Sequence, residues 1–346
     1  MEKRTKIVKT MLASFLMVSV ALTGCSANKA SDNTPETDAG MKAEGPKLTL
    51  RLADTLAVDH PIVAADKKFA EMVSERTNGR IKIEVFANSQ LGEEKTTIEQ
   101  VQLGALDFVR TGAGALAGFS KKFEVFSLPY IFESEEHQFK FLESAIGTKM
   151  LDGLESSRMK GLAYYSAGAR SFYSRKPLTG IADLKGQKIR VIQNKVNVDL
   201  IDALGANATP MAFGEVFSAL QTGVIDAAEN SFANLYTSNH QQQAKNLIID
   251  QHQRVPEVLI ISKTTWDKLP EEDRKIVKQA ALDSVKIERE LFDKFEKDAE
   301  AKIRAAGVTV TEVKDLKPWQ DAVKPVIDKY RKEFQEELDA IEKAKK

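Results

Sequence analysis

Two stretches of the chain, 119 residues apart, carry the same pattern. Residues 101–109 read VQLGALDFV and residues 220–228 read LQTGVIDAA, so each has an apolar residue, Gln-x-Gly-x, an aliphatic residue and Asp in that order. A second pair precedes them, GRIKIEV at 79–85 and GQKIRV at 186–191. Two short matches can arise by chance, but their shared order favours two α/β lobes of related design.

The first half shows how such a lobe is built. Residues 48–54 and 81–86 alternate between apolar and polar side chains, as strands do, and residues 60–80 have helical spacing that ends at Asn78-Gly79. A second helix ending near Gly104 leads into a strand that reaches Val109. This βαβαβ order predicts a mostly parallel sheet covered by helices. The 346 residues, 42% of them hydrophobic and 29% charged, suffice for two such lobes.

A long helix is predicted after Pro270. Apolar side chains recur on one face from Val277 to Ile303, and Gly307 ends the pattern. About 35 residues at 1.5 Å each span about 50 Å, which exceeds one lobe, so we expect this helix to cross both lobes. A coiled coil is the alternative, but no 3.5-residue repeat is sustained. We expect one lobe from residues 47–167 with about 256–292, and the other from 168–255 with about 293–346.

The N-terminus is typical of an exported chain. A basic start precedes an apolar run of twelve residues, Met11 to Leu22, which is too short to span a bilayer because about 20 residues are needed. We interpret residues 1–24 as a signal peptide. LTGC, ending at Cys25, resembles the lipobox of bacterial lipoproteins; the alternative is a chance cysteine. Cys25 is the only cysteine in the chain, and lipidation would explain an unpaired thiol in an exported protein.

The composition argues against nucleic acid as a partner. Residues 25–46 are small, polar and punctuated by Pro and Gly, which is typical of a flexible tether. Without residues 1–24 the chain has 46 basic and 49 acidic residues, a formal net charge of −3. No basic field remains that would attract a polyanion.

Known catalytic patterns are missing from the sequence. The four histidines are far apart and form no HExxH or Cys/His pattern, so neither a metal nor another cofactor is expected. There is no GxSxG elbow, phosphate loop or Gly-rich dinucleotide turn, and Cys25 is assigned to lipid. We therefore expect no enzyme activity.

Two arginines are the better candidates for function. Arg190 lies at the centre of a predicted strand, and Arg170 precedes an aromatic, alternating segment. In a two-lobed α/β protein, ligands bind between the lobes at the strand ends, where a guanidinium fork matches a carboxylate. An edge-strand salt bridge is the alternative for either arginine.

Four separated motifs together resemble the extracytoplasmic solute-binding proteins of tripartite ATP-independent periplasmic (TRAP) transporters, the DctP-like family. They are DLKGQKIRV, LGANATPMAFGEVFSALQTGVIDAAEN, GRIKIEVFANSQLGEEK and LPYIF, and the similarity covers the chain from Leu48 onward. The resemblance implies a two-lobed clamp like that of periplasmic binding proteins, crossed by a long helix. It also implies an organic acid as ligand and a TRAP permease as membrane partner.

The same resemblance implies roles for residues of the second half. Arg190 occupies the place of the principal carboxylate clamp, and Arg170 that of the family's second arginine. Asn230 matches a hydrogen-bonding asparagine, although Ser231 stands where proline is usual. Phe213 matches an aromatic that packs on the ligand, with core packing as the alternative.

In the first half, Glu94 lies where the family often supplies a polar contact. A solvated helix start is the alternative for Glu94, and Glu93 is its rival. Arg110 follows a first-lobe strand and is expected to bind a second carboxylate or several hydroxyls.

The expected ligand is a C4-dicarboxylate or a sugar acid such as a uronate. We expect a monomer, held outside the cell membrane by its lipid anchor, that delivers this ligand to the permease. A sensory co-receptor for a membrane kinase and a binding protein of an ATP-driven importer are the alternatives.

Overall fold

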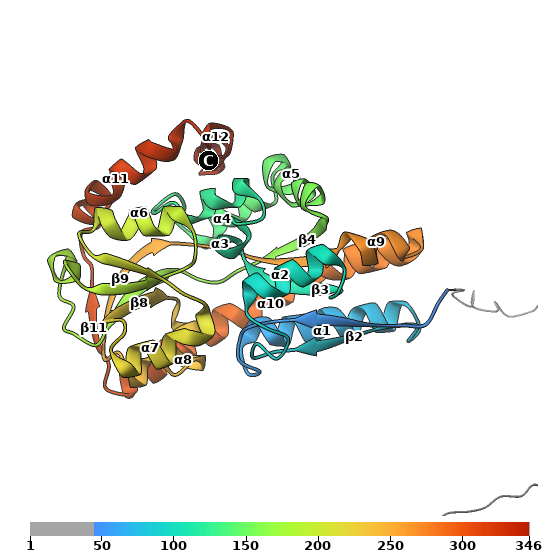
Figure 1. Ribbon diagram of the computed structural model, residues 1–346, viewed down its shortest axis with the longest axis horizontal. Coiled ribbons are helices and arrows are strands. Elements are labelled where there is room, and N and C mark those ends of the chain that lie inside the picture. Colours follow the sequence, from blue (N-terminus) through green and yellow to red (C-terminus); the bar gives the residue numbers. More distant parts are fainter. Residues whose placement is uncertain (1–44, 346) are drawn as a thin grey trace, which may run out of the picture. The chain divides into compact units, whose positions relative to one another are not determined.

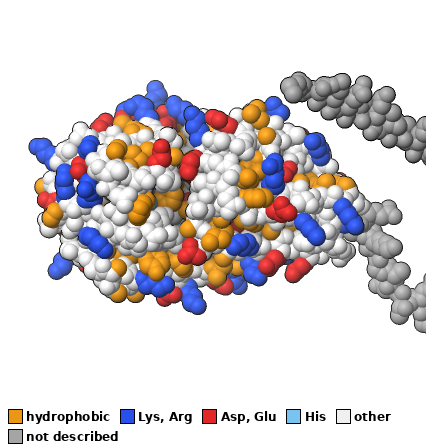
Figure 2. Space-filling model, turned by 60° about the horizontal axis from the view of Figure 1, so that its bottom comes forward, with side chains coloured by type: hydrophobic (Ala, Val, Ile, Leu, Met, Phe, Trp, Pro, Cys, Tyr) orange, Lys and Arg blue, Asp and Glu red, His pale blue; other side chains and the backbone are white. Residues whose placement is uncertain are grey.

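A computed structural model describes residues 45–345 of the chain. The predicted signal peptide, Cys25 and residues 25–44 of the predicted tether lie outside the described residues. Within the described part, no helix combines the length and the apolar character needed to cross a membrane. On the face shown in Figure 2, basic and acidic side chains are interspersed, in keeping with equal numbers of the two in the chain.

The first lobe is built on a five-stranded sheet in the order β2-β1-β3-β10-β4. Its strands β1 and β2 pair in parallel, as do β1 and β3, which is the predicted βαβαβ arrangement. Strand β10 is antiparallel to both β3 and β4, so the sheet as a whole is mixed. The strands are β1 (Leu48–Ala53), β2 (Ile81–Phe86), β3 (Phe108–Gly112), β4 (Met159–Tyr165) and β10 (Glu257–Ser262). The helices of this part are α1 (Pro61–Arg76), α2 (Glu94–Leu103), α3 (Ala113–Leu116), α4 (Glu135–Leu142), α5 (Ala145–Gly153) and α9 (Lys263–Lys268).

The second lobe is built on a six-stranded sheet in the order β11-β9-β5-β8-β6-β7. Here β6 is parallel to β7 and β8, whereas β5 is antiparallel to β8 and β9. The strands are β5 (Arg170–Ser174), β6 (Lys188–Val191), β7 (Asn207–Pro210), β8 (Ala227–Asn230), β9 (Asn246–Gln253) and β11 (Thr309–Glu312). The accompanying helices are α6 (Lys195–Ala203), α7 (Val216–Thr222) and α8 (Phe232–Thr237).

The repeated sequence pattern has the same structural cause in both lobes. Gly104 ends α2 and Gly223 ends α7, each with a φ of 77°, a left-handed conformation that favours glycine. Asp107 then accepts a hydrogen bond from a backbone N–H of β1, and Asp226 accepts one from β6, both at 2.9 Å. The two motifs therefore form the same glycine turn, and in both the Asp side chain accepts a hydrogen bond from the neighbouring strand.

The long helix α10 runs from Glu271 to Ala305, close to the predicted span (Figure 1). It packs on α1 and β4 of the first lobe and on α8 of the second. Val277 belongs to the core of the first lobe, while Ile303 is buried with Tyr173 of the second. The helix thus crosses both lobes, as its length predicts.

The C-terminal helices lie differently from the predicted division of the chain. Helix α11 (Lys317–Arg331) contacts α6 of the second lobe, but α12 (Gln335–Ala344) packs on α4 of the first. Leu338 and Ile341 are buried in the same cluster as Phe139 and Phe141, because the apolar face of α12 covers these aromatic rings. The contacts of α12 are therefore with α4, whereas the predicted division counts residues 293–346 with the second lobe.

Candidate functional site

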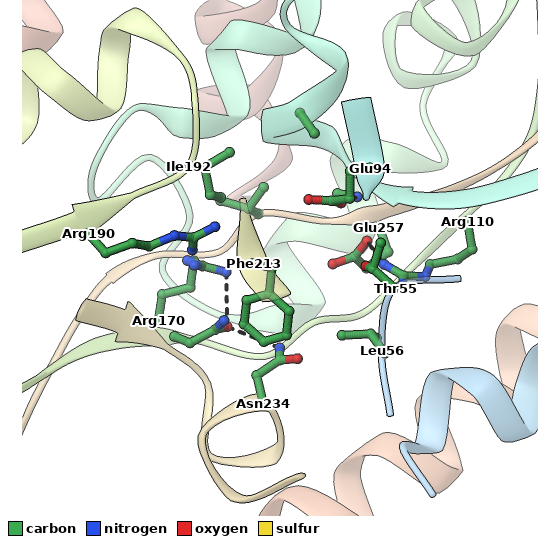
Figure 3. A pocket seen from close by; sticks show the side chains of 14 residues that line it. Thr55, Leu56, Glu94, Arg110, Arg170, Arg190, Ile192, Phe213, Asn234 and Glu257 are labelled. Carbon is green, nitrogen blue, oxygen red and sulfur yellow. Dashed lines mark hydrogen bonds and ion pairs between the residues drawn. The ribbon is translucent and has the colours of Figure 1, made fainter. Parts of the chain in front are cut away.

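A cleft lined by both lobes holds the predicted site residues (Figure 3). Its inner cavity has a volume of about 30 Å³, and a neighbouring cavity of about 300 Å³ shares Glu94, Ala115, Arg190, Ile192 and Phe213 with it. Figure 3 shows Arg190 and Arg170 on one side and Glu94, Glu257 and Arg110 on the other. All six predicted ligand residues line the inner cavity: Glu94, Arg110, Arg170, Arg190, Phe213 and Asn230.

Arg190 is a buried cation without a carboxylate partner. Ile189 and Val191 pack into the second-lobe core, so the alternation of β6 directs Arg190 to the opposite face. Only 3% of Arg190 is exposed, and its Nε and Nη2 donate to the carbonyl oxygen of Met211 at 3.2 and 3.0 Å. Within residues 45–345, no acidic side chain forms an ion pair with it. Burial lowers its pKa, but an arginine stays charged at neutral pH.

Arg170, in contrast, is paired with a carboxylate. Its Nε donates to Glu229 Oε2 at 2.5 Å, and its Nη2 donates to Glu229 Oε1 at 2.9 Å. Burial tends to lower the pKa of Arg170, but the charge of Glu229 outweighs this and raises it. The alternative interpretation of Arg170 is a structural salt bridge. Arg170 does form a salt bridge, with Glu229, in the wall of the cleft.

Glu229 has a second basic neighbour that helps to keep it charged. His252 Nε2 lies 3.7 Å from Glu229 Oε2, and its Nδ1 lies 2.9 Å from Asp250 Oδ2. Burial opposes the charge of His252, but Asp250 and Glu229 raise its pKa to about 9. The pKa of Glu229 falls to about 2, since Arg170 and His252 overcome the effect of burial.

Asn230 lines the cavity, and its amide oxygen is bonded within the protein. Its Oδ1 already accepts from Arg170 Nη1 at 3.0 Å, from Asn234 Nδ2 at 3.0 Å and from the backbone N–H of Ser231 at 2.9 Å. Its side-chain NH₂ group makes no hydrogen bond with any of residues 45–345 that the structure describes. With serine in place of proline at position 231, that backbone N–H serves to hold the Asn230 side chain.

Arg110 does not offer a free guanidinium. Its Nε donates to Asp54 Oδ2 at 2.8 Å, its Nη2 pairs with the other Asp54 oxygen, and its Nη1 donates to Glu257 Oε2 at 2.6 Å. Burial works against its charge, but the two carboxylates raise the pKa of Arg110 well above its ordinary value. For Glu257 burial dominates and raises the pKa despite the nearby arginine.

The neighbouring glutamates at the start of α2 point to different partners. Glu94 Oε1 accepts from Thr111 Oγ1 at 2.9 Å and from the backbone N–H of Gly112 at 2.8 Å. Glu93 Oε2 accepts from the backbone N–H of Gly214, in the second lobe, at 3.3 Å. Glu94 is thus held in the cleft wall by its own lobe, and its rival Glu93 reaches across the cleft.

Phe213 lines both cavities and is not confined to the core. It is partly buried, its ring lies 5.6 Å from that of His240, and the guanidinium of Arg190 lies 5.8 Å from its centroid. It also packs against the apolar clusters of both lobes. Phe213 thus packs against both cores and also borders both cavities.

Sequence reasoning missed the acidic residues that neutralise two of the three arginines. Asp54 directly follows β1, Glu257 begins β10, and Glu229 precedes the singled-out Asn230. A carboxylate next to a strand end was the available signal for Asp54. Among residues 45–345, no group of three or more His, Cys, Asp or Glu side chains is arranged to hold a metal ion.

The chain is similar to a family and to solved structures over most of its length. The family described as bacterial extracellular solute-binding protein, family 7 (DctP) matches residues 52–333. A TRAP periplasmic solute-binding protein from Bradyrhizobium sp. BTAi1, solved in complex with α/β-D-galacturonate, has 40% sequence identity and a TM-score of 0.83. That match covers 85% of this chain and 99% of the Bradyrhizobium chain.

Two further proteins give the same result. A TRAP periplasmic solute-binding protein from Pseudomonas putida F1 with bound D-glucuronate has 37% identity and a TM-score of 0.83, covering 85% of this chain and 97% of that one. A solute-binding protein from Chromohalobacter salexigens is 36% identical over 278 residues, which are 80% of this chain and 83% of the relative. These proteins bind solutes and are not enzymes. The chain belongs to the DctP family, the extracytoplasmic solute-binding proteins of TRAP transporters.

Proposed function

We propose that this protein binds a sugar acid, a hexuronate in particular, between its lobes and delivers it to a TRAP permease. The observation that carries the proposal is the state of Arg190, a buried guanidinium in the cleft with no carboxylate partner among the described residues. Burying an unpaired charge is unfavourable, so a buried unpaired guanidinium in a cleft indicates that a ligand of opposite charge forms the ion pair. A ligand carboxylate would do so through paired N–H donors.

The opposite wall favours hydroxyl groups over a second carboxylate. Around Arg110 lie the acidic side chains of Asp54, Glu94 and Glu257, so acidic groups outnumber basic ones there. A second ligand carboxylate would meet like charge, whereas sugar hydroxyls can donate to carboxylate oxygens. This argues for a uronate over a C4-dicarboxylate. The galacturonate and glucuronate bound to the similar Bradyrhizobium and Pseudomonas proteins support the same choice.

We assign the roles of the site residues accordingly. Arg190 binds the carboxylate, Arg170 and the Asn230 amide support the same end of the ligand, and Phe213 packs on the sugar ring. Glu94, through the oxygen not used by Gly112, accepts from a hydroxyl. For Arg110 we propose that it orients carboxylates of the cleft wall, in place of the predicted contact with a second ligand carboxylate.

The proposed contacts suffice for useful affinity. Hydrogen bonds to charged groups contribute about 1.5–3 kcal/mol each, and micromolar binding needs about 8 kcal/mol. Closure follows because a ligand held by both lobes stabilises the closed state.

A thermal-shift screen of the purified full chain tests this function. D-galacturonate, D-glucuronate, D-galactonate, succinate and neutral galactose serve as ligands, each at a series of concentrations. A ligand at 100 times its Kd adds about 2.7 kcal/mol of stability. We expect shifts with the sugar acids and none with galactose; a response to succinate alone would refute the uronate assignment, and no response to any acid would refute acid binding.

We further propose that the protein acts as a monomer, with the lobe boundaries given above except for residues 335–344, and that lipid on Cys25 anchors it. The support for lipidation is the LTGC motif after a short apolar run. Labelled palmitate supplied to expressing cells should be incorporated into the wild-type chain and not into Cys25→Ala, which should leave the membrane fraction. Equal membrane association of both chains would contradict the anchor.

A further inference from the structure

Among the polar contacts that join the lobes, two come from segments beside the cleft and do not involve its arginines. The first is the hydrogen bond from the backbone N–H of Gly214 to Glu93 Oε2, at 3.3 Å. Glu93 precedes α2, and its side chain makes no capping bond to that helix. Gly214 lies in the 3₁₀ turn of residues 213–215, next to Phe213.

Position 214 leaves room for Glu93. A Cβ atom on Gly214 would lie 2.4 Å from Glu93 Oε1, far inside van der Waals contact. The backbone of Gly214 is not left-handed, so alanine is compatible with its conformation. Close approach of the glutamate is therefore what glycine permits here.

The second contact comes from the opposite lobe. Asn194 follows β6, the strand that carries Arg190, and its Nδ2 donates to the carbonyl oxygen of Gly114 at 3.1 Å and to Ser127 Oγ at 3.0 Å. Its Oδ1 accepts from the backbone N–H of Asn197 and so caps α6. One amide thus serves its own helix with its oxygen and the first lobe with its nitrogen.

We propose that Glu93 and Asn194 latch the lobes in the closed state and so set how long a ligand is retained, without recognising it. Each contact joins residues of the two lobes, so each favours their association by its own free energy. A ligand that needs the closed state binds in proportion to that state's population. The latch therefore deepens the proposed binding function and rests on it, and it should act on all ligands by the same factor.

Matched variants isolate the two contacts. Glu93→Ala removes the acceptor, Glu93→Gln retains one, and Gly214→Ala displaces the glutamate by its Cβ. Asn194→Asp keeps the oxygen that caps α6 and loses the donor to Gly114 and Ser127. Glu75→Ala removes an exposed first-lobe carboxylate on α1, away from the cleft, as the control for charge.

The variants are tested in the full chain by calorimetric titration with D-galacturonate, D-glucuronate and D-galactonate, and by stopped-flow dissociation. We expect Glu93→Ala, Gly214→Ala and Asn194→Asp each to raise the Kd of all three ligands by a common factor of roughly five and to speed ligand release. Glu93→Gln and Glu75→Ala should match the wild type. Unchanged affinities in Glu93→Ala and Asn194→Asp would overturn the latch. Affinity changes that differ between the three acids would also overturn it, because they would indicate that the residue contacts the ligand directly.

A measurement without ligand separates the latch from the binding function. Spin labels at Leu103→Cys and Val224→Cys, exposed positions on the two lobes, report their separation in a chain that also carries Cys25→Ser. The latch predicts a smaller closed population in Glu93→Ala than with Glu93 present. If the wild type binds none of the acids, the binding proposal fails and this distance comparison alone decides the latch: identical distributions overturn it.

Discussion

Replacing Arg190 by methionine is the sharpest test of the cleft, because it separates function from stability. Methionine retains much of the side-chain length and removes the charge. The guanidinium has no ion-pair partner among residues 45–345, and within that range it donates only to the carbonyl of Met211. Losing those bonds costs about 1 kcal/mol, and removing a buried unpaired cation offsets that cost. We expect the free energy of unfolding to change by less than about 1 kcal/mol.

Ligand binding should respond very differently. Two charge-assisted hydrogen bonds contribute at least about 3 kcal/mol together, and the ligand carboxylate would be left unpaired in a closed cleft. Kd should therefore rise at least about 150-fold. Arg190→Lys keeps the charge but not the planar fork, so its Kd should fall between those of the wild type and Arg190→Met.

The assays are calorimetric titration with the acid that responds in the thermal screen, and urea unfolding without ligand. An unchanged Kd in Arg190→Met would refute the assignment of Arg190 as the carboxylate clamp. A loss of several kcal/mol of stability in the ligand-free variant would refute the reasoning in another way, because it would mean that Arg190 is a structural cation.

Three further predictions concern stability. Arg170→Met should destabilise the protein by about 3–5 kcal/mol in urea unfolding, because it leaves the buried Glu229 with only the more distant His252 as a basic neighbour; a loss below 1 kcal/mol would contradict this. The pKa of His252 is raised to about 9 in the folded protein from 6.5, so its contribution is complete below pH 6.5 and is lost as pH rises through 9. The free energy of unfolding, measured at pH 6.5, 8 and 9.5, should fall by about 3 kcal/mol in the wild type and much less in His252→Gln. Parallel pH profiles of the two proteins would contradict this prediction. Phe334→Ala should lower the free energy of unfolding by about 3–5 kcal/mol, because the Phe334 side chain beside α12 is only 1% exposed. Calorimetric melting of this variant and of Leu103→Ala, an exposed control, checks the prediction.

The secondary structure of this chain could be predicted well from local pattern. The βαβαβ start, the repeated turn at Gly104 and Gly223, and the helix from Glu271 to Ala305 all follow from apolar spacing and from glycine at left-handed positions. These features depend on residues a few positions apart, and neighbours in sequence are neighbours in space within a helix or turn. The two mixed sheets were harder, because β10 enters the first sheet from a distant part of the chain.

The predicted site residues share one cavity, but their chemical state was not readable from the sequence. Arg110, Arg170 and Arg190 each lie in a strand of the cleft wall, and only Arg190 lacks a carboxylate partner among the described residues. The partners of Arg110 lie 56 and 147 residues away in the chain. No local pattern reports pairing over such separations.

Sequence by itself determined the family, the order of helices and strands and the place of Arg190 on β6, because these depend on short motifs and on periodicity. Only the tertiary structure decided which guanidinium is free, that Glu93 reaches Gly214 while Glu94 stays with its own lobe, and that α12 covers α4. Ion pairs and interlobe contacts depend on which distant strand ends meet, and that is a property of the packed chain.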